Sequence, residues 1–420
     1  MNPILPLNHF VPDAEARVWK DGRLYLYGSY DVSGDTTYCS HVYRVFSSDD
    51  MTTWTDHGVS FRSFGGASDV PWSDMPLYAP DCVFHEGRYY LFFCLAGGSE
   101  GVAVSDAPEG PFRQATPVAG ADGSGIDPAV LVDDDGQVYY YWGQFQLNAA
   151  RLNADMRSLV PESITPNVLT EAAHGFHEGA CIRKRNGLYY LVYTDISRGR
   201  ATCLSYATSR SPLGPFEKGG VIIDNDGCDP QTWNNHGSIA EFNGKWYVFY
   251  HRSSQSSTFN RRVCVEPISF DGDGCIAEVP MTTQGVHGPL DAGKALEAGR
   301  ACQLSGKVRI APNPHAPGTE ILTMIEQGDW ACYRYLDFGT GCLSFSVEAA
   351  SPTCGGVIEI RLDQPDGPLA GTCRIEATGE WHKFRTFSAP IQSVEGVHAV
   401  YLRFLGGMGR LFDLKAFRFE

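Results

Sequence analysis

The chain has 420 residues, 43% of them hydrophobic, and its 49 acidic and 33 basic residues give a formal net charge of −16. Its length favours more than one domain, and its acidic excess argues against nucleic acid and anionic lipid as partners, because both are negatively charged. The sequence has no run of about 20 apolar residues, so we expect no membrane-spanning helix and no membrane partner.

The N-terminal stretch "MNPILPLNHFVPD" is not typical of a secretory signal, because it has neither a basic region nor a long apolar one. The 13 cysteines are scattered without C-x-x-C pairs, and several of them stand inside strand-like runs. This distribution is typical of reduced, buried thiols rather than of disulfides or a zinc site. We therefore expect a cytoplasmic protein.

A turn followed by an aromatic strand recurs five times in the first two thirds of the chain. Each copy has a turn glycine after Asp, Glu or Asn, and then a run rich in Tyr, Phe, Val and Leu, which suits a hairpin and a packed strand. Five copies of roughly 50 residues, with further short strands between them and little helical periodicity, predict a five-bladed β-propeller. The copies cover residues 21–30, 86–94, 135–143, 186–194 and 243–251.

Acidic residues stand at one repeated position ahead of these strands. Asp13, Asp127 and Glu178 each lie nine residues before the turn glycine of their own copy, and His236 lies eight residues before its glycine. The innermost strand of every propeller blade starts beside the central axis, so these side chains are expected to converge on one pocket. Carboxylates are rarely buried unless they are paired or used, and this pattern therefore predicts a functional site.

The second copy departs from the pattern, because the offset of nine falls on Tyr78 and the acid Asp81 lies six residues before the glycine. We expect Tyr78, Trp142 and Phe176 to form aromatic walls against a neutral sugar. Two carboxyl groups across a sugar ring are the usual machinery of glycoside hydrolysis, one as a proton donor and one as a base or nucleophile. A third acid would raise the pKa of the donor. The residues alone do not separate inversion from retention.

Two other polar clusters are interpreted as loops. Ser124 in "DGSGID" has no histidine at a spacing typical of a catalytic triad. The "DDDG" stretch at 133–136 lacks the spaced ligands of a calcium-binding loop and is typical of a hairpin turn.

Taken together, the five copies resemble glycoside hydrolase family 43, a family of five-bladed propellers. The segments that carry the resemblance are "VPDAEARVWKDGRLYLYGSYD", "YAPDCVFHEGRYYLF", "GIDPAVLVDDDGQVYYYWG", "EGACIRKRNGLYYLVYT" and "NHGSIAEFNGKWYVFYH". The resemblance implies that Asp13 is the general base, that Asp127 orients the acid and tunes its pKa, and that Glu178 is the general acid of an inverting reaction.

The same resemblance implies further contacts. Arg261 is the expected substrate-binding arginine of the last blade, and the adjacent Arg262 is the alternative. His236 is the expected ligand of a structural calcium ion or water in the propeller channel, while the chemistry itself is expected to need no cofactor.

The resemblance also implies the substrate. We expect an exo-acting α-L-arabinofuranosidase, β-D-xylosidase or both, acting on oligosaccharides derived from plant cell walls. An endo-arabinanase, a galactosidase, a non-catalytic carbohydrate-binding protein and a propeller scaffold for protein partners are the alternatives. The sequence leaves the oligomeric state open.

The sequence predicts two domains, a propeller over residues 1–285 and a β-sandwich of jelly-roll type over 293–420. The second part contains short alternating strands, and its segments "MIEQGDWACYRYLDFG", "GGVIEIRLDQPDGPLAGT", "TGEWHKFRTFSAPI" and "LFDLKAFRFE" resemble a family 6 carbohydrate-binding module. Trp330 and Trp381 are candidates to stack on sugars, and a purely structural role is the alternative.

The second part also departs from the family 6 pattern. Gly299 replaces one residue of an acidic pair, and Asp413, Lys415 and Ala416 stand where the family has an Asn, an acid and a Trp. These changes argue against the module's structural calcium site, where the lysine ammonium could supply the charge instead. They also argue against its usual sugar-binding cleft, so we expect the module mainly to brace the propeller.

Overall fold

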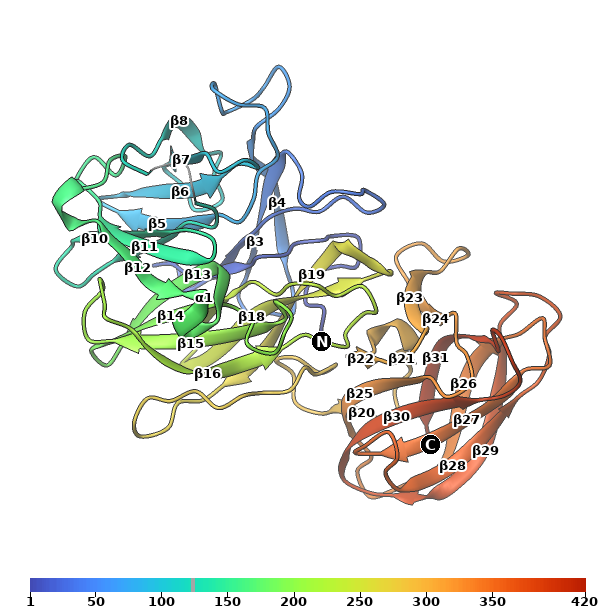
Figure 1. Cartoon of the computed structure of the whole chain (residues 1–420). Helices are drawn as coiled ribbons and strands as arrows, with labels where there is room; N and C mark the ends of the chain where they lie inside the picture. Colours follow the sequence, from blue (N-terminus) through green and yellow to red (C-terminus); the bar gives the residue numbers. More distant parts are fainter. Residues whose placement is uncertain (122–124) are drawn as a thin grey trace.

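The computed structural model describes residues 1–121 and 125–420, and it consists almost entirely of β-strands (Figure 1). Ser124 lies outside the described residues. Helical structure in the described part is limited to the short helix α1 (Glu171–His174) and two 3-10 turns, η1 (Pro161–Ser163) and η2 (Ala298–Arg300). None of the described helices has the length and apolar character that a membrane crossing requires. The all-β prediction is therefore confirmed.

The first two thirds of the chain form five antiparallel blades. Blade 1 contains β1 (Glu15–Val18), β2 (Leu24–Tyr27), β3 (Val42–Ser48) and β4 (Thr55–Arg62). Blade 2 contains β5 (Asp81–His85), β6 (Arg88–Cys94), β7 (Glu100–Ser105) and β8 (Arg113–Pro117). Blade 3 contains β9 (Ala129–Val132), β10 (Val138–Trp142), β11 (Gln146–Arg151) and β12 (Thr165–Thr170). Blade 4 contains β13 (Phe176–Arg185), β14 (Leu188–Asp195), β15 (Cys203–Ser209) and β16 (Glu217–Asp224), and blade 5 contains β17 (Ser238–Phe242), β18 (Lys245–Ser254) and β19 (Ser257–Ile268).

The ring closes through its innermost strands. β1 contacts both β5 and β17, and β13 contacts both β9 and β17. Ala14 and Gly237 form a parallel bridge between the first and last blades. The N-terminal segment runs beside β19, where the Ile4 amide donates to the Val263 carbonyl at 3.2 Å and the Val265 amide donates to Asn2 Oδ1 at 2.9 Å. These contacts complete the predicted five-bladed propeller.

The aromatic strands of the five repeats become the second strand of each blade, and their side chains fill the spaces between blades. Tyr25 and Tyr27 of blade 1 pack in one cluster with Phe93 of blade 2. Tyr141 of blade 3 packs with Tyr193 of blade 4 in another. Large aromatic side chains suit these positions because each blade must cover a broad face of its neighbour.

The remaining strands form the second domain. They are β20 (Leu290–Asp291), β21 (Leu296–Glu297), β22 (Gln303–Leu304), β23 (Arg309–Pro312), β24 (Glu320–Thr323), β25 (Trp330–Asp337), β26 (Cys342–Ala350), β27 (Gly356–Leu362), β28 (Leu369–Ile375), β29 (Arg385–Val394), β30 (Val397–Leu405) and β31 (Asp413–Phe419). One curled sheet runs from β20 through β25, β30, β27, β28, β29, β26, β31 and β24 to β23. It encloses a single apolar core that includes Tyr333, Phe345, Leu402 and Phe417, as expected for a β-sandwich.

The two domains share a packed interface near the N-terminus (Figure 1). Cys332 and Tyr401 of the sandwich belong to the same buried cluster as Tyr250 and Cys264 of the last blade. The Leu304 amide donates to the carbonyl of Gly227 across the interface at 2.7 Å. All 13 cysteines are free thiols, and 11 of them are buried.

Candidate active site

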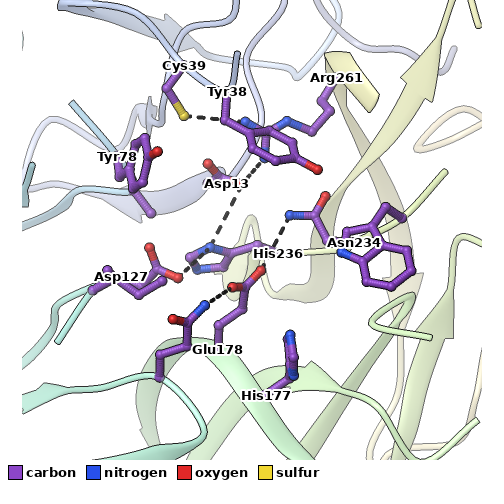
Figure 2. Close-up of a pocket in the computed structure, with 14 residues that line it drawn as sticks. Asp13, Tyr38, Cys39, Tyr78, Asp127, His177, Glu178, Asn234, His236 and Arg261 are labelled. Carbon is purple, nitrogen blue, oxygen red and sulfur yellow. Dashed lines mark hydrogen bonds and ion pairs between the residues drawn. The ribbon is translucent and has the colours of Figure 1, made fainter. Parts of the chain in front are cut away.

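A cavity of about 270 Å³ opens where the residues ahead of the innermost strands meet (Figure 2). Most of the residues that the sequence predicted for a site line it: Asp13, Tyr78, Asp127, Glu178, His236 and Arg261. Every blade contributes to this set, because each innermost strand starts at the same end of the propeller axis. The repeated offset in the sequence therefore corresponds to one place in space.

The backbone of Asp13 and that of Asp127 adopt the same unusual conformation. Their φ angles are 57° and 58°, in the left-handed region. This conformation costs roughly 1–2 kcal/mol for a residue with a side chain, although Asp tolerates it better than most. Strained positions of this kind occur most often at functional sites. Each Asp also lies just ahead of the innermost strand of its blade, β1 or β9, so the two carboxylates occupy equivalent positions in blades 1 and 3.

Asp13 is a buried carboxylate surrounded by hydrogen-bond donors and positive charge. Arg261 Nη1 donates to Asp13 Oδ1 at 3.2 Å, and Ser29 Oγ donates to Oδ2 at 2.6 Å. His251 Nδ1 lies 3.4 Å from Oδ1. Burial alone would raise the pKa of Asp13, but Arg261, His251 and His236 outweigh it and hold the pKa well below its usual range. Asp13 is therefore ionised at neutral pH.

Arg261 is fixed by a second carboxylate. Asp31 accepts from Arg261 Nε at 3.0 Å and from Nη2 at 2.9 Å, and the guanidinium carbon lies 4.7 Å from the centre of the Tyr38 ring. Burial would lower the pKa of Arg261, but Asp13 and Asp31 raise it well above its usual value. Arg262 does not line the cavity, because successive side chains of β19 point to opposite faces. Arg261 is therefore the arginine of the site.

Asp127 lies in the same cavity, and its pKa is shifted in the opposite direction. Its Oδ2 accepts from the Gly179 amide at 3.1 Å and lies 3.7 Å from His236 Nδ1. Burial raises the pKa of Asp127 well above its usual range, and the carboxylates of Glu178 and Asp13 raise it further. The cluster therefore retains a proton at neutral pH, since like charges in a low-dielectric site resist joint ionisation.

Glu178 is the most exposed carboxyl group of the three. Gln144 Nε2 donates to one of its oxygens at 3.0 Å, and Asn234 Nδ2 lies 3.4 Å from the other. The pairing of β13 with β14 shifts register on both sides of Glu178. Such irregularities re-aim a side chain. They explain how an acid at the start of a buried strand can face the cavity.

His236 is buried between the carboxylates, with Nδ1 3.8 Å from Asp13 Oδ1. Burial lowers its pKa despite the nearby acids. Within residues 1–121 and 125–420, no three His, Cys, Asp or Glu side chains are arranged to hold a metal ion. Ca²⁺ usually takes six to eight oxygen ligands, so the described side chains do not by themselves fit the calcium ion expected here.

Two predicted sugar contacts do not lie in the cavity. Trp142 is 2% exposed and packs in a core cluster of blades 2 and 3, while Phe176 is 0% exposed and packs between blades 3 and 4. Both stand at positions where strand alternation turns the side chain into the space between blades. Asp81 is also elsewhere, since it is buried in an ion pair with Arg17 at 2.7 Å.

The cavity also contains residues that the sequence did not indicate: Tyr38, Gln144, His177, Trp233 and Asn234. Tyr38 and Gln144 come from connections inside blades, and no repeated offset marks them. His177 adjoins Glu178, and Trp233 and Asn234 closely precede His236, so their proximity to predicted residues was the one available signal. Trp233 is 50% exposed at this site.

The candidate residues of the sandwich face other partners. Trp330 packs against the interdomain cluster, with its ring centre 5.3 Å from that of Tyr401. Arg410 covers one face of Trp381 at 3.5 Å and also forms two hydrogen bonds of 2.6 Å with the buried Asp413. Lys415 pairs instead with Glu348 at 2.7 Å.

A cavity that holds an ionised carboxylate beside carboxyl groups that retain a proton can supply both a base and an acid to one substrate. On this fold, that arrangement defines the class of glycoside hydrolases.

Comparison with known proteins identifies the family. The model of glycosyl hydrolases family 43 matches residues 1–276, and the model of carbohydrate binding module family 6 matches residues 298–420. The chain belongs to glycosyl hydrolases family 43, carries a family 6 module, and acts as a glycosidase on a carbohydrate.

Three relatives illustrate the similarity. A "Xylosidase/arabinosidase" of Thermoclostridium stercorarium is 31% identical, with 96% of each chain covered. An "Arabinoxylan arabinofuranohydrolase" of Bacillus subtilis (strain 168) is also 31% identical, over 100% of this chain and 92% of the relative. A crystal structure of a Bacillus subtilis arabinoxylan arabinofuranohydrolase in complex with cellotetraose has a TM-score of 0.59 at 30% identity, and covers 100% of this chain and 97% of that one.

Proposed function

We propose that the cavity removes terminal α-L-arabinofuranosyl or β-D-xylosyl residues from oligosaccharides, with inversion at the anomeric carbon. The observation that carries this proposal is the convergence of Asp13, Asp127 and Glu178 on one cavity, where Arg261 lowers the pKa of Asp13 while burial and the neighbouring acids raise the pKa of Asp127. The names of the similar proteins favour these two pentoses. A cavity of about 270 Å³ with the buried acids Asp13 and Asp127 in its lining suits one terminal sugar.

In this proposal Asp13 is the general base. It removes a proton from a water molecule as the water oxygen attacks the anomeric carbon. Glu178 is the general acid, which donates a proton to the leaving oxygen as the glycosidic bond breaks. We assign the acid's role to Glu178 rather than Asp127 because the leaving group extends towards solvent and Glu178 is the more exposed of the two. Asp127 keeps the proton within the cluster.

Arg261 has a remaining donor for the sugar. A guanidinium has five N–H groups, and Arg261 uses four of them towards Asp31, Asp13 and the Cys39 sulfur. The fifth is on Nη1, next to the Asp13 carboxylate. We propose that it binds a hydroxyl group of the terminal sugar and so places the anomeric carbon beside the base.

The test is hydrolysis of nitrophenyl α-L-arabinofuranoside and β-D-xyloside by the full chain and by Glu178→Gln. On unactivated oligosaccharides, whose sugar leaving group needs a proton, the variant should lose about a hundredfold to ten-thousandfold in kcat, the range typical of a general acid. The loss on the nitrophenyl glycosides should be smaller because nitrophenolate leaves as a stable anion, and the thermal unfolding of the variant should stay unchanged. Glu217→Gln is the matched control, because Glu217 is an exposed acid of the same blade, at the start of β16, and does not line the cavity. NMR of the first product formed should show the inverted anomer.

Full activity of Glu178→Gln on unactivated oligosaccharides would refute the assignment of the acid. Tight binding of the sugars without turnover would instead favour a non-catalytic carbohydrate-binding protein. Release from the middle of arabinan, with no activity on the nitrophenyl glycosides, would favour an endo-acting enzyme.

We also propose that the reaction needs no metal or cofactor, because an acid and a base suffice for hydrolysis. Treatment with EDTA followed by gel filtration should leave kcat within about twofold of the untreated enzyme. Loss of activity that added Ca²⁺ restores would contradict this proposal, and would support an ion held near His236 largely by water.

A further inference from the structure

The arginine next to the active-site arginine joins the two domains. Arg262 follows Arg261 on β19, and its side chain points away from the cavity towards the sandwich. Its Nη1 donates to Glu320 Oε2 at 3.0 Å, and its Nη2 donates to Glu320 Oε1 at 2.9 Å. Both side chains are buried. Glu320 is the first residue of β24, so a carboxylate of the second domain neutralises a buried charge of the catalytic blade.

Glu320 also holds the turn between β18 and β19. Its Oε1 accepts from Gln255 Nε2 at 2.8 Å, and Gln255 Oε1 accepts from Asn260 Nδ2 at 3.2 Å, directly before Arg261. Just after this turn, Thr258 of β19 places its Oγ1 2.6 Å from the Tyr38 hydroxyl. Tyr38 is the ring on which the Arg261 guanidinium lies. The turn and the start of β19 therefore link Glu320 to two neighbours of the active-site arginine. These are Asn260, which directly precedes Arg261, and Tyr38, on whose ring the guanidinium lies.

A second route runs through the N-terminal segment. Arg262 Nη2 donates to the carbonyl of Leu7 at 2.7 Å, and its guanidinium carbon lies 4.4 Å from the centre of the Phe10 ring. The Phe10 carbonyl accepts from the Asp31 amide at 2.9 Å. Asp31 is the carboxylate that fixes Arg261, so Arg262 supports the anchor of its own neighbour.

The sandwich makes room for this contact at Gly299. A Cβ atom at Gly299 would lie 2.7 Å from the Cβ of Glu320, closer than real Cβ contacts allow. The glycine that replaces an expected acid thus lets β24 approach η2 and lets Glu320 reach the propeller. Removal of one partner from a buried ion pair leaves an uncompensated charge and is strongly unfavourable. Arg262 therefore needs the Glu320 carboxylate to compensate its buried positive charge.

We propose that Glu320 of the sandwich domain is a positioning residue of the active site: through Arg262 and Gln255 it holds Arg261 where that residue contacts Asp13. The second domain is then a structural part of the catalytic centre rather than only an attached module. This inference rests on the proposed role of Asp13 as the base.

The experiment compares Glu320→Gln, Glu320→Asp and the control Glu348→Gln in the full chain. Glu348 belongs to the same domain but pairs with Lys415 away from the propeller. Glu320→Gln should lower kcat/KM by about tenfold to a hundredfold, the range of a small displacement in an active site. Glu320→Asp, which keeps the charge, should recover part of this loss, and Glu348→Gln should match the parent.

The pH profile separates positioning from mere structural support. Arg261 lowers the pKa of Asp13, so a displaced Arg261 lets that pKa rise, and the base then loses its charge at a higher pH. The acidic limb of kcat/KM in Glu320→Gln should therefore move to higher pH. A lower melting temperature with an unshifted limb would overturn the proposal, because it would show a structural role only.

Two further variants keep the test decisive. Gln255→Ala removes the hydrogen bonds of Gln255 with Glu320, Asn260 and Ser33 at a partly exposed turn, and it should produce a smaller shift of the same limb if Glu320→Gln does not fold; an unshifted limb would then overturn the proposal. Asp13→Asn tests the underlying assignment. Full activity in Asp13→Asn refutes the proposed function itself, whereas an inactive Asp13→Asn beside an unaltered Glu320→Gln refutes only the positioning role.

Discussion

At the scale of single residues, the side chains around each carboxyl group of the site determine the direction in which its pKa shifts. Asp13 and Asp127 are both buried and share the same backbone conformation. Arg261 beside Asp13 holds the pKa of that carboxyl group low, whereas burial and the neighbouring acids Glu178 and Asp13 raise the pKa of Asp127. Two chemically identical side chains at equivalent positions thus acquire opposite pKa shifts from the charges around them.

Trp233 provides a prediction about the leaving group. It is half-exposed on the cavity wall and adjoins Asn234, which contacts Glu178. A sugar beyond the scissile bond can stack on this ring, and a contact of this kind contributes about 0.5–1.5 kcal/mol. Trp233→Ala should therefore raise KM by about twofold to tenfold for a trisaccharide, but should not change it for a methyl glycoside.

Phe64→Ala is the control for this measurement. Phe64 is equally prominent on the surface at 58% exposure, but it packs on His41 and does not line the cavity. Equal effects of Trp233→Ala on both substrates would contradict a contact with the leaving group.

At the scale of elements, the start of each innermost strand is the unit that builds the site. These starts carry Asp13, Asp127 and Glu178, and the strand that contains Glu178 continues through a glycine that touches the next blade. A Cβ at Gly179 would lie 2.8 Å from His236 Cδ2, and its φ of 61° is left-handed. Its amide also donates to Asp127.

Gly179→Ala should therefore displace His236 and the Gly179 amide together. We expect a loss of about a hundredfold or more in kcat/KM and a decrease of about 1–3 kcal/mol in the free energy of unfolding. Gly187→Ala is the matched control, because Gly187 has a φ of 77° in the adjoining turn, but a Cβ added there would meet no atom within 4 Å. It should lose stability through backbone strain alone and keep its activity. Similar kinetic effects in the two variants would show that crowding against His236 is unimportant.

At the scale of the whole molecule, the two domains depend on each other. The interface contains an apolar cluster with side chains from both domains, and it contains the buried pair of Arg262 and Glu320. Loss of one partner of such a pair costs about 3–5 kcal/mol, a large share of the roughly 5–15 kcal/mol by which a folded domain is stable.

A chain that ends at residue 285 should therefore give little soluble protein, or should melt well below the full chain. Soluble yield and thermal unfolding measure this effect. Arg262→Met in the truncated chain removes the unpaired charge and should restore part of the stability. A truncated propeller that melts at the temperature of the full chain would contradict the dependence of one domain on the other.

The sequence alone determined the fold class, the number of blades and the three acids. These features could be read because they depend on local patterns: turn glycines, aromatic strands, and one offset that repeats in several blades. The offset predicted Asp13, Asp127, Glu178 and His236 in one cavity because equivalent positions in a ring of blades meet at the axis.

Only the tertiary structure decided the rest. Trp142 and Phe176 pack between blades because the pleat of a strand, rather than its distance from the axis, determines which way a side chain points. Tyr38, Gln144 and Trp233 come from connections that follow no repeat. The contact of Glu320 with Arg262 joins residues 58 positions apart, and no local pattern encodes it. The charge state of each acid likewise depends on neighbours that come together only when the ring closes.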